Sequence, residues 1–137
     1  MAQLFAQGRD LIKMHHEEAS GLGLPLFLDE RVFYTLEEAN VLIVLGLFTL
    51  QGRLVGYTAG TVTQHPYADT LVCSAHAIFV HPGYRRCGNG RRLMDTIEHE
   101  ARARGAITMW HAKPGSKFDL VLRARRCREL ETVYIAR

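Results

Sequence analysis

The chain has 137 residues, of which 47% are hydrophobic and 23% are charged, and its formal net charge is +3. This size and balance fit a single domain, residues 1–137, with an ordinary hydrophobic core, and they exclude a low-complexity or disordered chain. A charge this small does not by itself imply a nucleic-acid partner.

Hydrophobic periodicity and turn residues predict elements in the order ααβββαβαβ. We expect helices over Gln3 to Glu18, from a cap at Asp29 to about Ala39, from the Gly88-Asn89-Gly90 turn to about Arg104, and over Ser116 to Arg125. We expect strands over Val41 to Leu50, Leu54 to Thr63, about Leu71 to Val80, Ile107 to His111, and Thr132 to Ile135. The order predicts an α/β fold, a mixed sheet with helices on its faces.

Cysteine usage and hydropathy indicate the compartment. The odd number of cysteines (Cys73, Cys87 and Cys127) and the absence of C-x-x-C spacing argue against a disulfide framework or a zinc site, so we expect no metal. The first residues lack the pattern of a signal peptide, and the longest apolar run is too short to cross a bilayer. We therefore expect a cytoplasmic protein without a membrane partner.

The most informative segment lies between Phe79 and Gly105. An apolar strand is followed by a proline, by arginines, by two glycines one residue apart, and then by a helix. This order predicts free backbone N–H groups at a helix N-terminus, which suit a pyrophosphate. Arg91 and Arg92 follow Gly90 where a Walker-type loop needs Gly-Lys-Ser/Thr. A Walker-type loop is therefore excluded. A dinucleotide fingerprint does not fit either, because it needs a third small residue and lies in the chain's first βαβ unit, whereas three strands come first here.

The turn Arg85-Arg86-Cys87-Gly88-Asn89-Gly90 resembles the R/Q-x-x-G-x-G/A turn of the GNAT N-acetyltransferase superfamily. The lead-in Val80-His81-Pro82-Gly83-Tyr84-Arg85 resembles the same family, and the element order is consistent with it over nearly the whole chain. The resemblance implies a three-layer αβα acyl-CoA N-acyltransferase fold whose first strand is missing here. Small phage-encoded members of the family are similar in their short length and in two segments, Met14-His15-His16-Glu17-Glu18 and His111-Ala112-Lys113-Pro114-Gly115-Ser116. This similarity would place the protein in a host cytoplasm.

The resemblance implies acetyl-coenzyme A (acetyl-CoA) as cosubstrate. The pyrophosphate site maps onto the backbone N–H groups of Arg86 to Arg91, with close approach allowed at the glycines. Main chain near Phe79 and Val80 would pair with the pantetheine arm, and Arg85, Arg86, Arg91 and Arg92 would meet phosphates or remain solvated. The implied cofactor-binding residues are therefore Phe79, Val80, Arg85, Arg86, Cys87, Gly88, Asn89, Gly90 and Arg91.

The implied reaction is acyl transfer from a thioester to an amine. Deprotonating an alkylammonium with a pKa near 10.4 costs roughly 4–5 kcal/mol at pH 7, so a base is useful. Where the family often has glutamate, this chain has Ser74. His76, two residues on, faces the same side if the strand alternates, and it is our first candidate base, with a packed strand histidine as the alternative.

Other catalytic candidates are less direct. In the family, a tyrosine in the last helix commonly acts as the general acid, and its position here is Leu122. Ser116 and Tyr134 are the candidates to replace it. Glu17 and Glu18 lie where the family's first helices frame the acceptor, so they are candidates for binding a cationic amine or sharing the base's role. His111, at a strand end beside the expected cleft, is a further candidate.

Three function classes follow. The first is an acetyl-CoA-dependent N-acetyltransferase that acts on a primary amine of a small molecule or protein. The second is a catalytically weak GNAT-fold binding module that regulates a partner protein. The third, nucleic-acid binding through C-terminal arginines, is not expected because no recognition motif accompanies them. A homodimer through a sheet edge is a further expectation.

Overall fold

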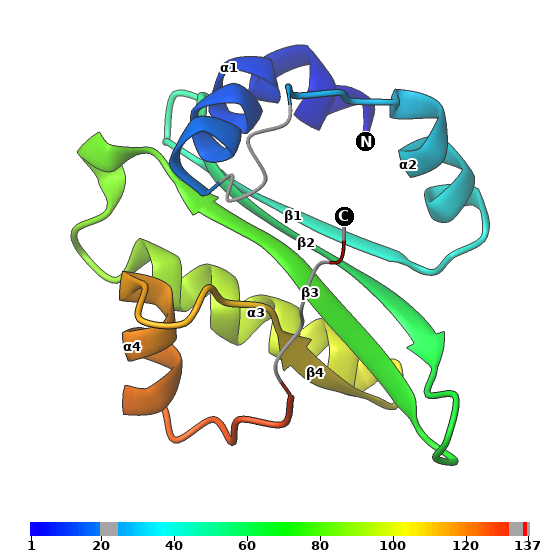
Figure 1. Cartoon of the computed structure of the whole chain (residues 1–137). Coiled ribbons are helices and arrows are strands. Elements are labelled where there is room, and N and C mark those ends of the chain that lie inside the picture. The colour runs from blue at the N-terminus through cyan, green and yellow to red at the C-terminus, as the bar shows by residue number, and fades with distance from the viewer. Residues whose placement is uncertain (20–24, 132–135, 137) are drawn as a thin grey trace.

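The structure is a computed structural model, and it describes residues 1–19, 25–131 and 136. Its helices are α1 (Ala2–Ala19), α2 (Glu30–Glu38), α3 (Asn89–Ala103) and α4 (Lys117–Ala124), with a short 3-10 turn at Pro82–Tyr84. Its strands are β1 (Leu42–Phe48), β2 (Leu54–Gln64), β3 (Leu71–Val80) and β4 (Ala106–Trp110) (Figure 1). The predicted mixed α/β architecture is confirmed, and the predicted last strand, Thr132 to Ile135, lies outside the described residues.

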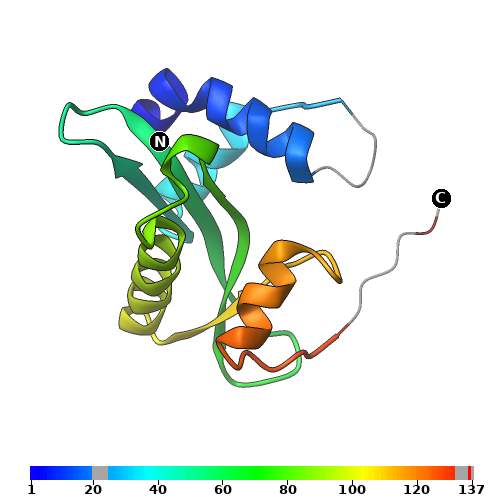
Figure 2. The same ribbon diagram turned by 90° about the vertical axis from the view of Figure 1, so that its left-hand side faces the viewer.

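The sheet has a separate apolar core on each face, because buried side chains alternate along its strands. On one face, Ile97 and Ala101 of α3 pack against Cys73 and Ala75 of β3. On the other face, α1 packs against the sheet through a cluster of Leu11, Leu54, Tyr57 and Phe79. Figures 1 and 2 show the resulting layers, with α1 and α2 on one side of the sheet and α3 on the opposite side.

Sheet topology determines where a ligand could enter. The strand order is β1-β2-β3-β4, with antiparallel pairs except for the parallel pair β3 and β4, which α3 connects. The β3–β4 pairing ends at Ala75 and Trp110, whereas β3 continues to Val80. In the described part of the chain, the last residues of β3 therefore have no strand on that edge.

A β-bulge interrupts β3 at His76. Gly60 pairs with Ala75 and Ala59 pairs with Ala77, so His76 is the extra residue on the bulged strand. Gly60 permits this close approach, because a Cβ there would lie 2.9 Å from Cys73 Sγ and 3.1 Å from the Ser74 carbonyl oxygen. The regular alternation of the strand is therefore interrupted at His76, whose Nδ1 nevertheless lies 2.9 Å from the Ser74 carbonyl oxygen.

The two edges of the sheet differ. β4 is followed by α4, which is attached by an edge-to-face contact of Trp110 with Phe118 and by ion pairs from Arg125 to Asp95 and Glu98, both at 2.9 Å. At the opposite edge, β1 pairs only with β2, and no strand precedes α1 among the described residues. The homodimer across a sheet edge stays a prediction.

Candidate functional site

The turn before α3 leaves several backbone donors without acceptors in the helix. Cys87 and Gly88 both have left-handed backbone angles, with φ of 70° and 75°, and they redirect the chain into α3. The first intrahelical bond runs from the Arg92 N–H to the Gly88 carbonyl at 3.0 Å. The amides of residues 89–91 precede that bond, and Gly88 supplies no side-chain cap. This helix end can donate to an anion.

The space in front of the turn is open. A Cβ built on Gly88 or Gly90 meets no heavy atom within 4 Å. Gly90 lies inside the helix without a positive φ, so neither backbone nor packing within the described chain requires glycine there. The Asn89 side chain donates to the Tyr84 carbonyl at 2.8 Å and anchors the turn. The geometry fits a pyrophosphate, which would occupy the open space that a side chain at Gly90 would fill.

Positive charge surrounds this turn. Arg91 lies 3.5 Å from Asp95 in the next turn of α3. Among the described residues, Arg86 and Arg92 form no ion pair, and both are exposed. Cationic side chains beside free amides raise the local concentration of an anionic ligand.

Arg85 connects the end of β3 with α1. Its Nε donates to the Val80 carbonyl at 2.8 Å, and its guanidinium lies 5.3 Å from the centre of the Phe79 ring. It also forms an ion pair with Glu18 at the C-terminal end of α1. This contact places the candidate acceptor residue Glu18 beside the candidate cofactor turn.

At the end of β3, the backbone N–H and C=O groups of successive residues are directed in turn at β2 and at the opposite edge of the strand. The Phe79 carbonyl is directed at β2, because a Cβ on Gly56 would meet it at 2.9 Å. Since backbone groups of successive strand residues alternate, those of Ile78 and Val80 are directed at the edge that β4 has left. The main chain of Val80, rather than that of Phe79, is therefore directed at the open edge between β3 and β4, where the Val80 carbonyl accepts from Arg85 Nε.

A second polar group lies where β3 and β4 diverge. Ser74 Oγ is 2.7 Å from His111 Nε2, and His76 Nδ1 is 2.9 Å from the Ser74 carbonyl oxygen. Cys73 and Ala75 belong to the core beneath α3, so Ser74 between them faces the opposite side of the sheet. The structure brings together His76 and His111, which were separate candidates in the sequence analysis.

The hydrogen bond of His76 determines which ring nitrogen can act as a base. A carbonyl oxygen only accepts, so Nδ1 carries the proton and neutral His76 keeps a lone pair on Nε2. Part of the ring reaches solvent, yet its partial burial lowers the pKa of His76; the nearby His111 adds to this effect and the Ser74 carbonyl opposes it. His76 is therefore neutral at pH 7.

Comparison with known proteins agrees with this geometry. Residues 9–117 match the acetyltransferase (GNAT) family. The chain belongs to the GNAT family. The sequence-based predictions of that family and of an N-acetyltransferase are thereby confirmed, although no curated protein sequence matches the chain.

Solved structures of similar fold include several acetyltransferases. Aminoglycoside N-acetyltransferase AAC(6')-Iy in complex with CoA is 17% identical, with a TM-score of 0.74 over 100% of this chain and 94% of that one. Ribosomal-protein-alanine N-acetyltransferase from Brucella melitensis biovar Abortus 2308 is 18% identical, with a TM-score of 0.72 over 98% and 94%. The aminoglycoside acetyltransferase meta-AAC0020 from an uncultured soil sample, in complex with sisomicin, is 16% identical, with a TM-score of 0.69 over 99% and 86%.

In this GNAT domain, a buried aromatic group that the sequence analysis missed supports the end of β3. His15 Nδ1 lies 2.7 Å from the Tyr57 hydroxyl, and the His15 ring stacks on Phe79 at 5.2 Å. Burial lowers the pKa of His15 and raises the pKa of Tyr57. Nothing in the local sequence indicated this contact, because it joins α1 to the middle strands.

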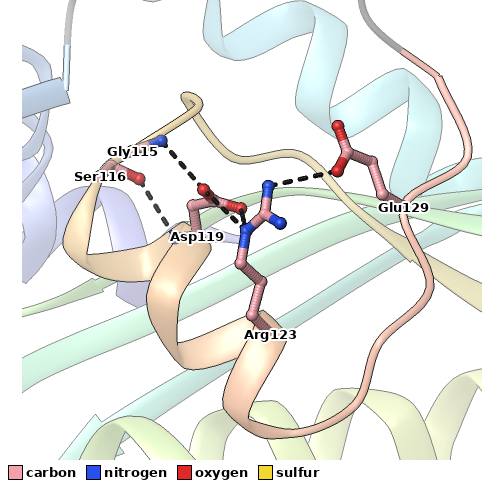
Figure 3. Close-up of polar contacts among 5 residues, drawn as sticks. All are labelled: Gly115, Ser116, Asp119, Arg123 and Glu129. Carbon is pink, nitrogen blue, oxygen red and sulfur yellow. Dashed lines mark hydrogen bonds and ion pairs between the residues drawn. The ribbon is translucent and has the colours of Figure 1, made fainter.

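Ser116 has a structural task in this GNAT domain. Its Oγ accepts the Asp119 N–H at 3.2 Å and caps α4, while the Asp119 carboxylate accepts the Gly115 N–H at 2.9 Å (Figure 3). Arg123 bridges Asp119 and Glu129, so the cap is part of a larger polar network. Of the other candidate acids, Tyr134 lies outside the described residues, and the family's tyrosine position is the buried Leu122.

Residues 1–19, 25–131 and 136 hold neither a candidate metal centre nor a membrane-spanning helix. These residues contain no group of three or more His, Cys, Asp or Glu side chains placed to hold a metal ion. None of their helices is long and apolar enough to cross a membrane.

Proposed function

We propose that this GNAT protein is an acetyl-CoA-dependent N-acetyltransferase acting on a primary amine of a small molecule or a protein. The observation that carries the proposal is the open, uncapped turn before α3, which lies beside the end of β3 where β4 has diverged. A diphosphate at the turn and an extended arm along β3 would occupy these two features together.

The chain's own residues have distinct tasks in cofactor binding. The amides of residues 86–91 bind the pyrophosphate, with Arg86 and Arg92 free to meet further phosphates. The main chain of Val80 holds the arm. Bound acetyl-CoA supplies an acyl thioester, and positioning this group against the amine provides much of the rate acceleration.

His76 is the proposed base. Its Nε2 lone pair accepts the proton that an alkylammonium must lose, a step that costs roughly 4–5 kcal/mol at pH 7. His111 and Ser74 lie beside it and form the alternative route for this proton. Ser116 and Tyr134 stay candidates for protonating the leaving thiolate, which is stable enough to need little help.

The acceptor is proposed from charge. Glu17 and Glu18 at the end of α1 are exposed carboxylates, and Glu18 reaches the cofactor turn through Arg85. They suit a cationic amine. Two proteins of similar fold carry the names of an aminoglycoside and a ribosomal-protein-alanine acetyltransferase, so both a small molecule and a protein are reasonable acceptors. The three cysteines are free, which fits the proposed cytoplasmic location.

Isothermal titration with acetyl-CoA tests cofactor binding. We expect Gly90→Trp to abolish measurable affinity without unfolding the protein, because the added side chain enters open space in front of the turn. Thr96→Trp, an equally bulky change at an exposed position further along α3, is the matched control and should bind like the unmodified protein. Equal affinity of both variants would refute the assignment of the turn.

A second candidate function is a GNAT-fold binding module that regulates a partner protein. It is favoured by Ser74 and Leu122 at the positions where the resemblance implies a glutamate and a tyrosine. Release of free thiol from acetyl-CoA over a panel of amines separates the two functions. Cofactor binding without turnover for any amine would support the module.

A further inference from the structure

A hydroxyl is paired with an imidazole where β3 and β4 separate. The two strands pair up to Ala75 and Trp110 and then diverge, which leaves a fork between them. His111 is the first residue past this pairing, and Ser74 Oγ lies 2.7 Å from its Nε2. Ser74 is half-buried and His111 is exposed, so the pair is accessible from the open part of the fork. A serine hydroxyl at hydrogen-bond distance from a histidine is the arrangement of an activated nucleophile.

Both side chains of this pair lie on the face of the sheet away from α3. Cys73 and Ala75, on either side of Ser74, belong to the core beneath α3, and Trp110 packs against the same core. Because side chains alternate along a strand, Ser74 and His111 are directed at the opposite face. When the His111 ring is neutral with its proton on Nδ1, its Nε2 accepts the hydroxyl proton of Ser74. The pair then has the roles of nucleophile and base.

The length of β3 places a thioester at the closed end of the fork, a step that rests on the proposed function. The arm of coenzyme A leaves the diphosphate at the turn before α3 and follows the open edge of β3 from Val80. Between phosphate and sulfur this arm has about as many bonds as four residues of chain, roughly 13 Å when extended. The steps from Val80 to His76 cover the same distance, roughly 13 Å. The acetyl group beyond the sulfur therefore arrives where the Ser74 hydroxyl meets His111.

We propose that Ser74 is a nucleophile that carries the acetyl group from acetyl-CoA to the amine, with His111 as its base. His111 Nε2 takes the hydroxyl proton while Oγ attacks the thioester carbonyl. The C–S bond breaks, and His111 returns the proton to the departing thiolate, which leaves an acetyl ester on Ser74. The amine, deprotonated by His76, attacks this ester; the C–O bond breaks, and Oγ recovers a proton from the amine nitrogen through His111. The products are the acetylated amine, CoA and the unchanged protein.

A covalent acetyl ester lets the first half of the reaction run without any amine, which direct transfer does not. With labelled CoA, unlabelled acetyl-CoA and no amine, the protein should transfer the label into acetyl-CoA. Ser74→Ala should abolish this exchange because the nucleophile is lost. Thr63→Val, which removes an exposed hydroxyl from β2, is the matched control and should exchange like the unmodified protein. His111→Gln should slow the exchange about 100-fold, a typical contribution of a general base, without changing the affinity for acetyl-CoA.

Peptide mass spectrometry locates the acetyl group. After incubation with acetyl-CoA alone and rapid quenching in acid, the tryptic peptide of residues 54–85 should carry one acetyl group on Ser74, and addition of an amine acceptor before quenching should remove it. An acetyl group found only on other residues would contradict the assignment.

The outcomes separate this inference from the proposed function. Absence of exchange in a protein that binds acetyl-CoA would overturn the inference, as would exchange that persists in Ser74→Ala. Turnover of an amine by that same protein would then show direct transfer and leave the proposed function intact. A protein that does not bind acetyl-CoA in the titration would refute the proposed function, and the inference with it.

Discussion

At His76, a backbone irregularity places a side chain in the position of the proposed base. The bulge removes it from the ladder between β2 and β3, and the Ser74 carbonyl then holds Nδ1. The ring keeps Nε2 available, and its lowered pKa keeps it neutral at pH 7. A histidine held in this way accepts a proton without first having to lose one.

Exchanging His76 for glutamine tests its role as a base. We expect His76→Gln to lower kcat about 100-fold, a typical contribution of general-base catalysis. In the unmodified enzyme kcat/KM should fall as the pH drops through the lowered pKa of His76, below the ordinary value of 6.5, because protonation removes the base. This acid limb should disappear in the variant. His99→Gln, an exposed histidine on α3, is the matched control. An unchanged acid limb would clear His76.

Residue type and spacing indicated His76 as a candidate, and its neighbours could not be predicted. The pair of Ser74 and His111 depends on the register of β3 against β4, which hydrophobic pattern does not determine. The stacking of His15 on Phe79 likewise needs the position of α1 over the sheet. Local sequence is more informative at the glycine turn, because the proposed ligand groups there are main-chain amides.

Among the helices, too, local sequence predicted some features, while others depend on hydrogen bonds that only the structure shows. The sequence predicted the start of α3 from the glycines and the cap of α2 from Asp29, both of which the structure confirms. It treated Ser116 as a candidate acid, whereas the hydroxyl caps α4. A side chain at a helix start can serve either purpose, and only its hydrogen bonds distinguish them.

Two substitutions at Ser116 separate its structural role from a catalytic one. Ser116→Ala should lower the free energy of unfolding by about 1 kcal/mol, because the Asp119 N–H loses its acceptor. Ser116→Asn, which keeps a capping oxygen, should recover most of that stability. If Ser116 only caps α4, kcat is the same in both variants when measured well below their melting temperatures. A loss of kcat in the asparagine variant would instead support Ser116 as the acid.

In the tertiary structure as a whole, α1 is attached to the sheet partly through a buried hydrogen bond between His15 and Tyr57. Burial lowers the pKa of His15, whose Nδ1 meets the Tyr57 hydroxyl. The order of the elements was predictable because each has its own periodicity and turn residues. The length by which β3 extends past β4 was not, because it depends on pairing between distant segments. The open edge of β1 agrees with the missing first strand that the family resemblance implied.

This packing predicts a pH dependence of stability. The unfolded chain binds more protons than the folded one once the pH falls below about 6.5, so the free energy of unfolding should decrease between pH 7 and pH 5. His15→Gln should reduce that decrease, while His76, whose pKa is also lowered, maintains part of it. Urea unfolding of both proteins across this range measures the difference. Parallel pH profiles would show that His15 does not titrate on unfolding.

Acetyl transfer by this protein, as proposed, requires a diphosphate bound by the main-chain amides before α3. Titration of ¹⁵N-labelled protein with acetyl-CoA, followed by amide chemical shifts, observes those groups directly. We predict the largest shifts at residues 86–91, with a second set at Ile78 and Val80 along the open edge of β3. Shifts confined to other parts of the chain, or none at saturating cofactor, would contradict it.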